Sequence, residues 1–226
     1  MQRMRVRYAK RGRLRFTSHR DFSRAFERAL VRARIPMAYS SGFNPHPRIS
    51  YAGASPTGAA SEAEYLEIGL AERVEADRLA ADLDDALPDG LDVMEVVEAT
   101  SGSLGERLEV SRWRIDLPGS APDDVAPAVA AFLAATSVEV ERMTKKGMRA
   151  FDSRAAVLAL SATAYDAGTA LEVVLRHTEP AVRPDDVLSG LRHVGGLDAP
   201  GTALLTRLEQ GPYDAASGAI GDPLSG

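Results

Sequence analysis

Residues 4–8 alternate between apolar side chains and arginine. This period of two places Met4, Val6 and Tyr8 on one face and the arginines on the other, which predicts a half-buried strand. Residues 13–16 repeat the alternation after a Lys-Arg-Gly turn. We therefore expect a second short extended segment at residues 13–16.

Residues 18–34 change to a helical period. The apolar positions of one face are Phe22, Ala25, Phe26, Ala29, Leu30 and Ala33. Ser18 and Asp21 stand three residues apart at the start, as the two partners of a capping box do. Pro36 ends the helix by about Arg34, because the residue before a proline disfavours helical dihedrals.

The pattern up to residue 98 completes one supersecondary unit. It predicts extended segments at residues 49–52, 65–70 and 91–97, and a helix at residues 74–87. The order is strand, helix, strand, strand, helix, strand. This is the βαββαβ order of a ferredoxin-like sandwich.

A second, looser round of the same order follows a small, polar linker at residues 99–105. Its predicted elements are strands at 110–117, 138–143, 157–160, 171–175 and 204–208, and helices at 125–135 and 184–193. We therefore expect an α+β protein built from two ferredoxin-like βαββαβ sandwiches in tandem. The expected domains are residues 1–99 and 107–211, followed by a loose tail at 212–226 that is rich in small residues.

Composition narrows the class of protein. Of 226 residues, 45% are hydrophobic and 26% are charged, which is ordinary for a globular protein with a packed core. No stretch approaches the ~18–20 consecutive apolar residues that span a bilayer. The basic N-terminal segment is not followed by the apolar stretch of a secretory signal. We expect a soluble, cytoplasmic protein without a membrane partner.

The chain contains no cysteine. This excludes disulfides, cysteine-ligated zinc, an iron–sulfur cluster held by thiolates and a thiol nucleophile. The other ligand candidates, His19, His46, Glu62 and Glu64, match no known metal-ligand spacing. We therefore expect neither a metal site nor a cofactor.

Charge is unevenly distributed along the chain. Residues 1–50 hold 13 Lys and Arg against 2 Asp and Glu, a local charge of +11, whereas residues 51–108 hold 3 against 14, a local charge of −11. The whole chain carries a net charge of −5. The basic segment is therefore a candidate binding surface, although the net charge of the chain is negative.

Four short motifs carry a resemblance to a known family. They are GRLRFTSHRD at residues 12–21, FERAL at 26–30, YSSGFNPHP at 39–47 and EAEYL at 62–66. These motifs resemble those of the radical SAM-linked family, a domain family of unknown function. Residues 206–212 resemble the ending of a stand-alone, actinobacterial type of member. The sequence departs from the family pattern at Thr17, Arg20 and Ser41, where the family often has Leu, Leu and Gln.

The resemblance implies a partner rather than a reaction. Members of this family occur alone or fused to radical SAM proteins, so a radical SAM protein is the implied partner. A chain without cysteine cannot hold the cluster of such an enzyme. We therefore expect that the chain is not itself a radical SAM enzyme, and whether it has another activity stays open.

The basic segment predicts an RNA-binding surface. On the predicted helix, Arg20, Arg24, Arg28 and Arg32 recur every four residues, opposite the phenylalanines. Tyr8, Phe16, Tyr39 and Phe43 are interleaved as candidates for base stacking. The predicted nucleic-acid-binding residues are Arg5, Arg7, Arg13, Arg15, Arg20, Arg24, Arg28, Phe43, Asn44, His46 and Arg48.

Other interpretations of these residues stay open. The arginines can instead pair with the acidic segment of the same chain, or bind an acidic protein. His19 and His46 are weak candidates for an acid and a base in phosphodiester cleavage, because histidine is the side chain that most often serves in general acid–base catalysis. Asp21 is a third weak catalytic candidate, as a nucleophile, but a capping role explains it more simply.

Three functions follow from these observations. The leading hypothesis is a non-catalytic accessory protein that binds tRNA or rRNA and presents it to a radical SAM enzyme. The first alternative is a small, metal-independent RNA-processing enzyme that uses His19 and His46. The second alternative is an interaction module that docks a radical SAM protein without nucleic acid.

Overall fold

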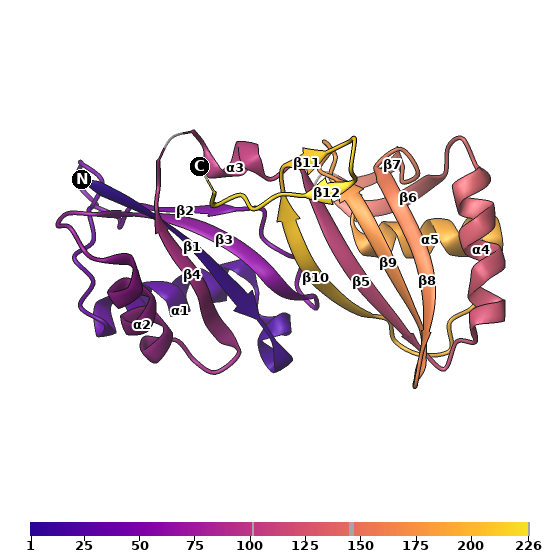
Figure 1. Cartoon of the computed structure of the whole chain (residues 1–226), viewed down its shortest axis with the longest axis horizontal. Coiled ribbons are helices and arrows are strands. Elements are labelled where there is room, and N and C mark those ends of the chain that lie inside the picture. The colour runs from indigo at the N-terminus through magenta and orange to yellow at the C-terminus, as the bar shows by residue number, and fades with distance from the viewer. Residues whose placement is uncertain (101, 145–146, 226) are drawn as a thin grey trace. The chain divides into compact units, whose positions relative to one another are not determined.

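The protein has a mixed α+β fold (Figure 1). The computed structural model of the chain describes residues 1–100, 102–144 and 147–225. Contacts divide the chain into two compact units: unit 1 contains Met1–Leu108 and Glu209–Gly226, and unit 2 contains Glu109–Leu208. The α+β class expected from the sequence is confirmed.

Unit 1 is an antiparallel sheet with two helices on one face. Its elements are β1 (Gln2–Lys10), the 3-10 helix η1 (Gly12–Phe16), α1 (His19–Arg32), β2 (Ile49–Ala52), β3 (Ala60–Leu70), α2 (Ala76–Ala86), β4 (Leu91–Glu98), α3 (Leu104–Arg107), and the short pair β11 (Tyr213–Asp214) and β12 (Ala219–Ile220). The strands lie in the order β4-β1-β3-β2. From β1 to β4, apart from η1, the elements follow the βαββαβ order expected from the sequence.

The helix expected from residue 18 is present, and its start is capped as predicted. The backbone amide of Asp21 donates to the Ser18 hydroxyl oxygen at 3.2 Å, and the Ser18 hydroxyl donates to the Asp21 carboxylate at 2.6 Å. The helix ends at Arg32. Arg34 then adopts a left-handed backbone with φ of 54°, which turns the chain before Pro36.

The extended segment expected at residues 13–16 is wrong. Residues 12–16 form η1, in which Leu14 donates its backbone amide to Arg11 at 3.1 Å and Thr17 donates to Leu14 at 2.9 Å. These are bonds between residues three apart, as in a 3-10 turn. In a strand, Leu14 and Phe16 would lie on one face, opposite Arg13 and Arg15. In η1, the Phe16 side chain is instead 67% exposed.

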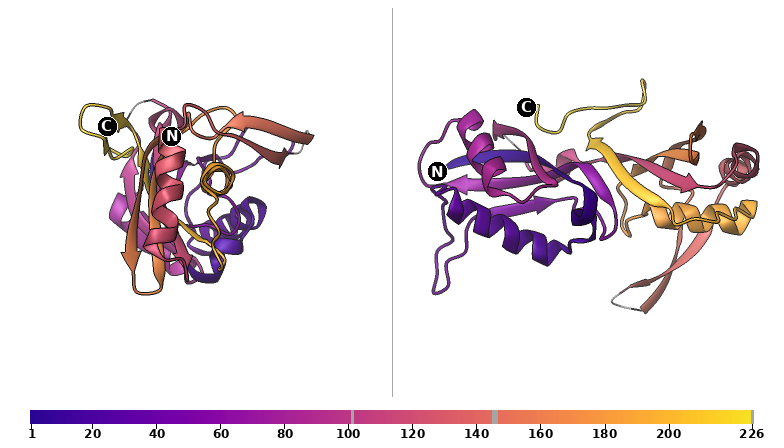
Figure 2. Two further views of the ribbon diagram at one scale, coloured as in Figure 1. Left: turned by 90° about the vertical axis from the view of Figure 1, so that its right-hand side faces the viewer. Right: turned by 90° about the horizontal axis from the view of Figure 1, so that it is seen from below.

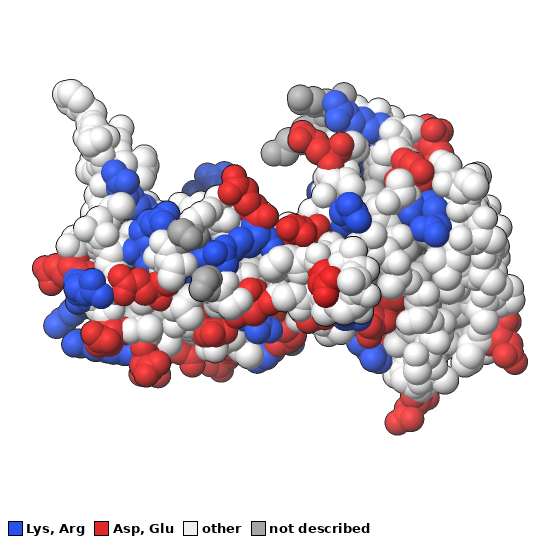
Figure 3. Space-filling model, turned by 45° about the horizontal axis from the view of Figure 1, so that its top comes forward, with Lys and Arg blue, Asp and Glu red and all other residues white. Residues whose placement is uncertain are grey.

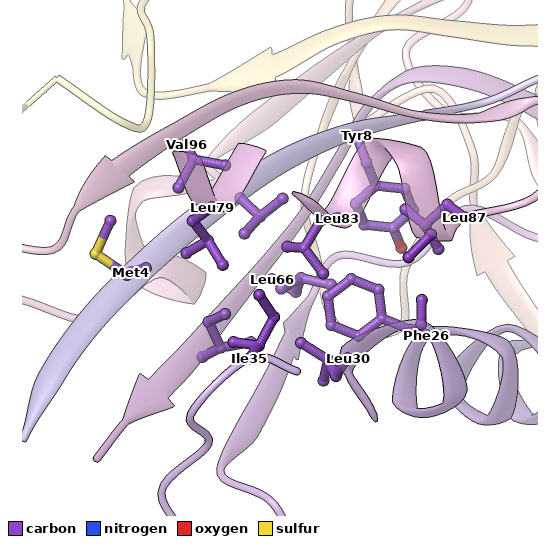
Figure 4. Packing of buried hydrophobic residues seen from close by; sticks show 14 of the residues in the cluster. Met4, Tyr8, Phe26, Leu30, Ile35, Leu66, Leu79, Leu83, Leu87 and Val96 are labelled. Atoms are coloured by element: carbon purple, nitrogen blue, oxygen red, sulfur yellow. The ribbon is translucent and has the colours of Figure 1, made fainter. Parts of the chain in front are cut away.

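The core of unit 1 lies between the sheet and the two helices (Figure 4). Strand β1 contributes Met4, Val6 and Tyr8 from one face, as its alternation predicts. The Tyr8 ring stacks on Phe22 of α1, with centroids 4.7 Å apart. The expectation that Tyr8 offers a surface for base stacking is therefore wrong, because its side chain fills the core.

The opposite face of this sheet is also partly covered. A second cluster of buried residues contains Ala63, Tyr65, Leu104, Leu108 and Leu224. The linker expected at residues 99–105 is therefore not all loop, because its last residues form the start of α3. Ser101 lies outside the described residues. The segment expected as a loose tail carries the β11–β12 pair and buries Leu224.

Unit 2 repeats the arrangement with an insertion. Its elements are β5 (Val110–Pro118), α4 (Pro122–Ala134), β6 (Glu139–Thr144), β7 (Gly147–Asp152), β8 (Val157–Tyr165), β9 (Gly168–Arg176), α5 (Pro184–Gly195) and the first five residues of β10 (Leu204–Gly211). The main sheet has the order β10-β5-β9-β8. The strand expected at residues 138–143 instead pairs with β7 in a separate two-stranded ribbon, which projects from the unit (Figure 2).

Arg142 connects the ribbon to the rest of unit 2. Arg142 on β6 forms an ion pair with Asp186 of α5, donates to the Ala181 carbonyl oxygen at 3.0 Å and lies over the Phe151 ring at 4.8 Å. Over the described part of the chain, no helix is long and apolar enough to cross a membrane.

Candidate nucleic-acid interface

The outer face of α1 carries a row of arginines. Phe22, Phe26, Ala29 and Leu30 face the core, so Arg20, Arg24 and Arg28 point away from it and are exposed. Residues four apart on a helix are separated by about 6 Å along its axis. Arg32 continues the row, and these four residues are called the arginine face below.

The arginine face is not neutralised by its own chain. Over the described residues, Arg20, Arg24, Arg28 and Arg32 form no ion pair and no side-chain hydrogen bond. Of the two acidic residues in α1, Asp21 is engaged with Ser18, which leaves Glu27 beside the arginines. A row of like charges at this spacing costs a helix ~0.2–0.5 kcal/mol per pair, so nothing in the helix itself favours it.

A shallow depression runs along the same face. It is lined by Arg24, Glu27, Arg28, Val31 and Arg32. Val31 is an apolar side chain among these charged residues, and it is 73% exposed. Val31 did not stand out in the sequence, because its exposure depends on the direction in which α1 packs.

At the start of α1, η1 adds an aromatic ring and a cation. Phe16 and Arg13 are both exposed. Arg15 is half-buried instead, since its Nε donates to the Gly58 carbonyl oxygen at 2.9 Å. The predicted binding residue Arg13 thus lies on an open surface, whereas Arg15 helps to hold residues 56–58 in place.

Beyond the other end of α1, residues 39–47 form a closed loop that projects from unit 1 (Figure 2). Tyr39 pairs with Pro47 across its base, and the Ser40 amide donates to the His46 carbonyl oxygen at 2.9 Å. The His46 amide in turn donates to the Ser40 hydroxyl at 3.0 Å. The loop therefore presents Phe43 fully exposed, together with Asn44 and His46.

The arginines of β1 are arranged differently. Arg5 is fully buried, with its Nε 3.3 Å from the Glu67 carboxylate and its Nη2 donating to the Gly102 carbonyl oxygen at 2.8 Å. The assignment of Arg5 to a nucleic-acid-binding surface is therefore corrected, because a buried guanidinium cannot reach a phosphate. Arg7 is half-buried and donates to the Glu62 carbonyl oxygen at 3.0 Å.

The basic and acidic segments neutralise each other only in part. Glu67 accepts from Arg3 and Arg5, while Arg11 bonds to Glu62 and Asp92, which raises the pKa of the Arg11 guanidinium, mainly through its hydrogen bond to Glu62. Figure 3 shows basic and acidic side chains intermixed on one face of unit 1. Pairing within the chain thus accounts for the β1 side of the basic segment, but not for the arginine face.

The catalytic candidates are not brought together. His19 stands at the start of α1, where its ring meets Tyr51 edge-on with centroids 4.9 Å apart. His46 lies in the loop beyond the far end of this 14-residue helix, which is about 21 Å long at ~1.5 Å per residue. Asp21 is engaged in capping the helix. Among the described residues, no group of three or more His, Asp and Glu side chains is placed to hold a metal ion.

Comparison with known proteins identifies the family. Residues 3–184 match the model of a family described as an uncharacterized protein conserved in bacteria (DUF2344). The match covers well over half of the chain, so the protein belongs to this family. A comparison with curated proteins gave no match.

Proposed function

We propose that the protein binds RNA through the arginine face and the loop of residues 39–47, which carries Phe43, and presents this RNA to a partner enzyme of the radical SAM class. The observation that carries the proposal is the contrast between two sets of arginines. Those of β1 donate to a carboxylate or a carbonyl oxygen of unit 1, whereas Arg20, Arg24 and Arg28 point outward along one helix without an acidic partner among the described residues. Phosphates are the natural counter-charge for such a row.

The aromatic side chains at both ends of the helix favour unpaired RNA. Phe16 ends η1, just before α1, and Phe43 lies in the loop of residues 39–47 after α1; both side chains are exposed. Sequence-tolerant binding of single strands combines a cationic track for the backbone with rings on which bases stack. The deep major groove of duplex RNA is inaccessible to side chains, so a paired segment uses these rings less well.

The partner class is proposed on the resemblance of residues 12–66 to the radical SAM-linked family. The chain has no cysteine to hold an iron–sulfur cluster, so the chemistry would belong to the partner. In the same proposal, both units are ferredoxin-like sandwiches and the protein acts in the cytoplasm. The strand orders β4-β1-β3-β2 and β10-β5-β9-β8 support the fold part of the proposal.

One observation favours a second candidate, the docking of an acidic protein surface. Val31 and Phe43 are exposed apolar side chains, and Val31 lies among the arginines of α1. Protein interfaces combine an apolar centre with a charged rim. Cleavage by His19 and His46 gains no such support, because α1 separates the two rings.

Binding of fluorescently labelled single-stranded RNA at several salt concentrations tests the proposal. The variant Arg20→Ala/Arg24→Ala/Arg28→Ala removes three charges from the arginine face. Alanine is a strong helix former and the change relieves repulsion, so the variant keeps its fold. A matched control is Arg149→Ala/Arg176→Ala/Arg192→Ala, which removes three exposed charges from unit 2.

We expect wild type and control to bind with an affinity that falls steeply with salt. For single strands, the slope of log K against log salt concentration is about −0.7 per phosphate contact. Because the variant Arg20→Ala/Arg24→Ala/Arg28→Ala removes three such contacts, its slope should be less steep by about 2. Equal binding by both triple variants would reject the arginine face as the RNA surface. Binding of a purified acidic protein, unaffected by nuclease, would favour the second candidate.

A further inference from the structure

A pocket opens on the sheet of unit 1, on the side away from α1 and α2. Its polar walls are Arg3 of β1, Arg48 and Ser50 at β2, and Glu67 of β3, and its volume is about 280 Å³. These side chains alternate with Met4, Ile49 and Leu66, which pack toward the helices. The pocket therefore lies on the opposite face of the sheet from the arginine face.

A glycine gives the pocket its depth. A side chain at Gly69 would place a Cβ 3.2 Å from Arg48 Cβ and 3.4 Å from the sulfur of Met1. The backbone of Gly69 does not have the positive φ that excludes other residues. An alanine is therefore compatible with the backbone of the strand, and its methyl group would displace the Arg48 side chain that lines the pocket.

The walls carry a surplus of positive charge. Glu67 is the acidic residue of the pocket, and its carboxylate is already shared by Arg3 and by the buried Arg5, each at 3.3 Å. Arg48 has no acidic partner among the described residues, and its Nε donates to the Tyr39 carbonyl oxygen at 3.3 Å. Two guanidinium groups, those of Arg3 and Arg48, thus line the pocket against one carboxylate, which leaves a net charge of about +1 on the walls.

We propose that this pocket binds a phosphate monoester. Such a group carries a charge of about −1.5 to −2 at pH 7, which is opposite in sign to the charge of the walls. The guanidinium of Arg48 presents donors in the fork geometry that suits phosphate oxygens, and the Ser50 hydroxyl adds a donor. The volume of about 280 Å³ lies just below the ~300–1,000 Å³ of ligand sites, so the pocket has room for a phosphate group and part of a nucleoside.

Two sources share this chemistry, a free mononucleotide and the terminal phosphate of an RNA strand. Titration calorimetry with AMP, adenosine and inorganic phosphate measures the preference for the phosphate. A short oligonucleotide with and without a 5′-phosphate, and with and without a 3′-phosphate, identifies the terminus. Saturable binding of AMP assigns the free nucleotide, whereas binding that needs a phosphorylated terminus and is absent for AMP assigns the RNA end.

Two variants locate the site. Arg48→Ala removes a charge, and Gly69→Ala removes space while it keeps every charge. We expect each to weaken phosphate-dependent binding at least tenfold, with thermal unfolding close to that of wild type. Arg20→Ala/Arg24→Ala/Arg28→Ala should bind AMP as wild type does, because those residues lie on the other face of the sheet.

The proposal is overturned if wild type binds AMP no better than adenosine and shows no preference for a phosphorylated terminus. It is equally overturned if folded Arg48→Ala and Gly69→Ala bind as wild type does. These outcomes are separate from those of the α1 experiment, which removes RNA affinity without a change in the pocket.

Discussion

The rings of Tyr8 and Phe22 lie nearly parallel, at 4° to each other, and join the first strand to the first helix. Phe22 also contacts Phe26 and Tyr51, with centroid distances of 5.8 and 5.9 Å. This aromatic cluster fixes α1 on the sheet. It therefore decides which helix face, the one with the arginines, is turned outward.

Truncation of Phe22 should destabilise unit 1 strongly. Phe22→Ala leaves a cavity among three aromatic rings, and such changes cost about 3–5 kcal/mol of unfolding free energy. Urea unfolding followed by circular dichroism measures the loss. The matched control Phe43→Ala removes a fully exposed ring and should change stability by less than about 0.5 kcal/mol. Equal effects of the two changes would contradict the packing described for Phe22.

The carboxylate of Glu67 should matter more than that of Glu98. Glu67→Ala removes the acidic partner of a fully buried guanidinium, Arg5, and breaking a buried pair costs about 3–5 kcal/mol. Glu98 pairs with Arg73 at the surface, where both side chains are about half exposed or more, so Glu98→Ala should cost about 1 kcal/mol or less. Chemical denaturation of both variants compares them directly, and a small effect of Glu67→Ala would show that Arg5 does not depend on this carboxylate.

Loss of the N-cap should weaken α1. Ser18→Ala removes the acceptor for the Asp21 amide and should cost about 0.5–2 kcal/mol. Ser41→Ala in the exposed loop serves as the control. If Asp21 acts only as a capping residue, Asp21→Asn will change stability modestly and leave any activity toward RNA unchanged. Thermal unfolding and an RNA incubation assay together separate the two roles.

Asp152 should make the stability of unit 2 depend on acid pH. Burial opposes its charge, but the backbone amides of Val138 and Arg154 donate to its carboxylate at 2.9 Å each, and the net effect lowers its pKa below the usual 3.8. A lowered pKa in the folded state adds stability at pH values above the unfolded pKa, and this stability is lost as pH falls through the folded pKa.

Asp152→Asn keeps an acceptor oxygen but removes the charge. At pH 7 it should lower the unfolding free energy by an amount on the order of 1 kcal/mol, because bonds to a charged acceptor are stronger. The difference from wild type should shrink as pH is lowered from 5 toward 2. A difference that stays constant over this range would show that the carboxylate charge has no such role.

Local sequence patterns predicted much of unit 1, because its helices and strands depend on residues that are close together in the sequence. The spacing of Phe22 and Phe26 and the Ser18–Asp21 cap predicted α1 and the outward row of arginines. By contrast, the alternation at residues 13–16 is equally compatible with a 3-10 turn, which η1 adopts. The pairing of β6 with β7 was not predicted for a similar reason, because the pattern of a strand does not indicate which sheet the strand joins.

Binding residues were predicted correctly as exposed only where the exposure of a side chain depends on residues close to it in the sequence. Arg5 alternates with core residues and so belongs to the other sheet face, which the sequence presents as open. That face is covered here by residues more than 90 positions away, including Gly102, which accepts from Arg5. The pocket at Arg3, Arg48 and Gly69 was missed because it combines three strands, none of which shows a motif for it.

Unit 1 is discontinuous, whereas unit 2 is one uninterrupted segment. Residues 109–208 are synthesised as a complete unit before Leu224 is added to the chain. The first sheet must wait for that residue to cover its second face, although its helices are synthesised first. A chain released after residue 208 should therefore contain every residue of unit 2 but lack the segment that completes unit 1.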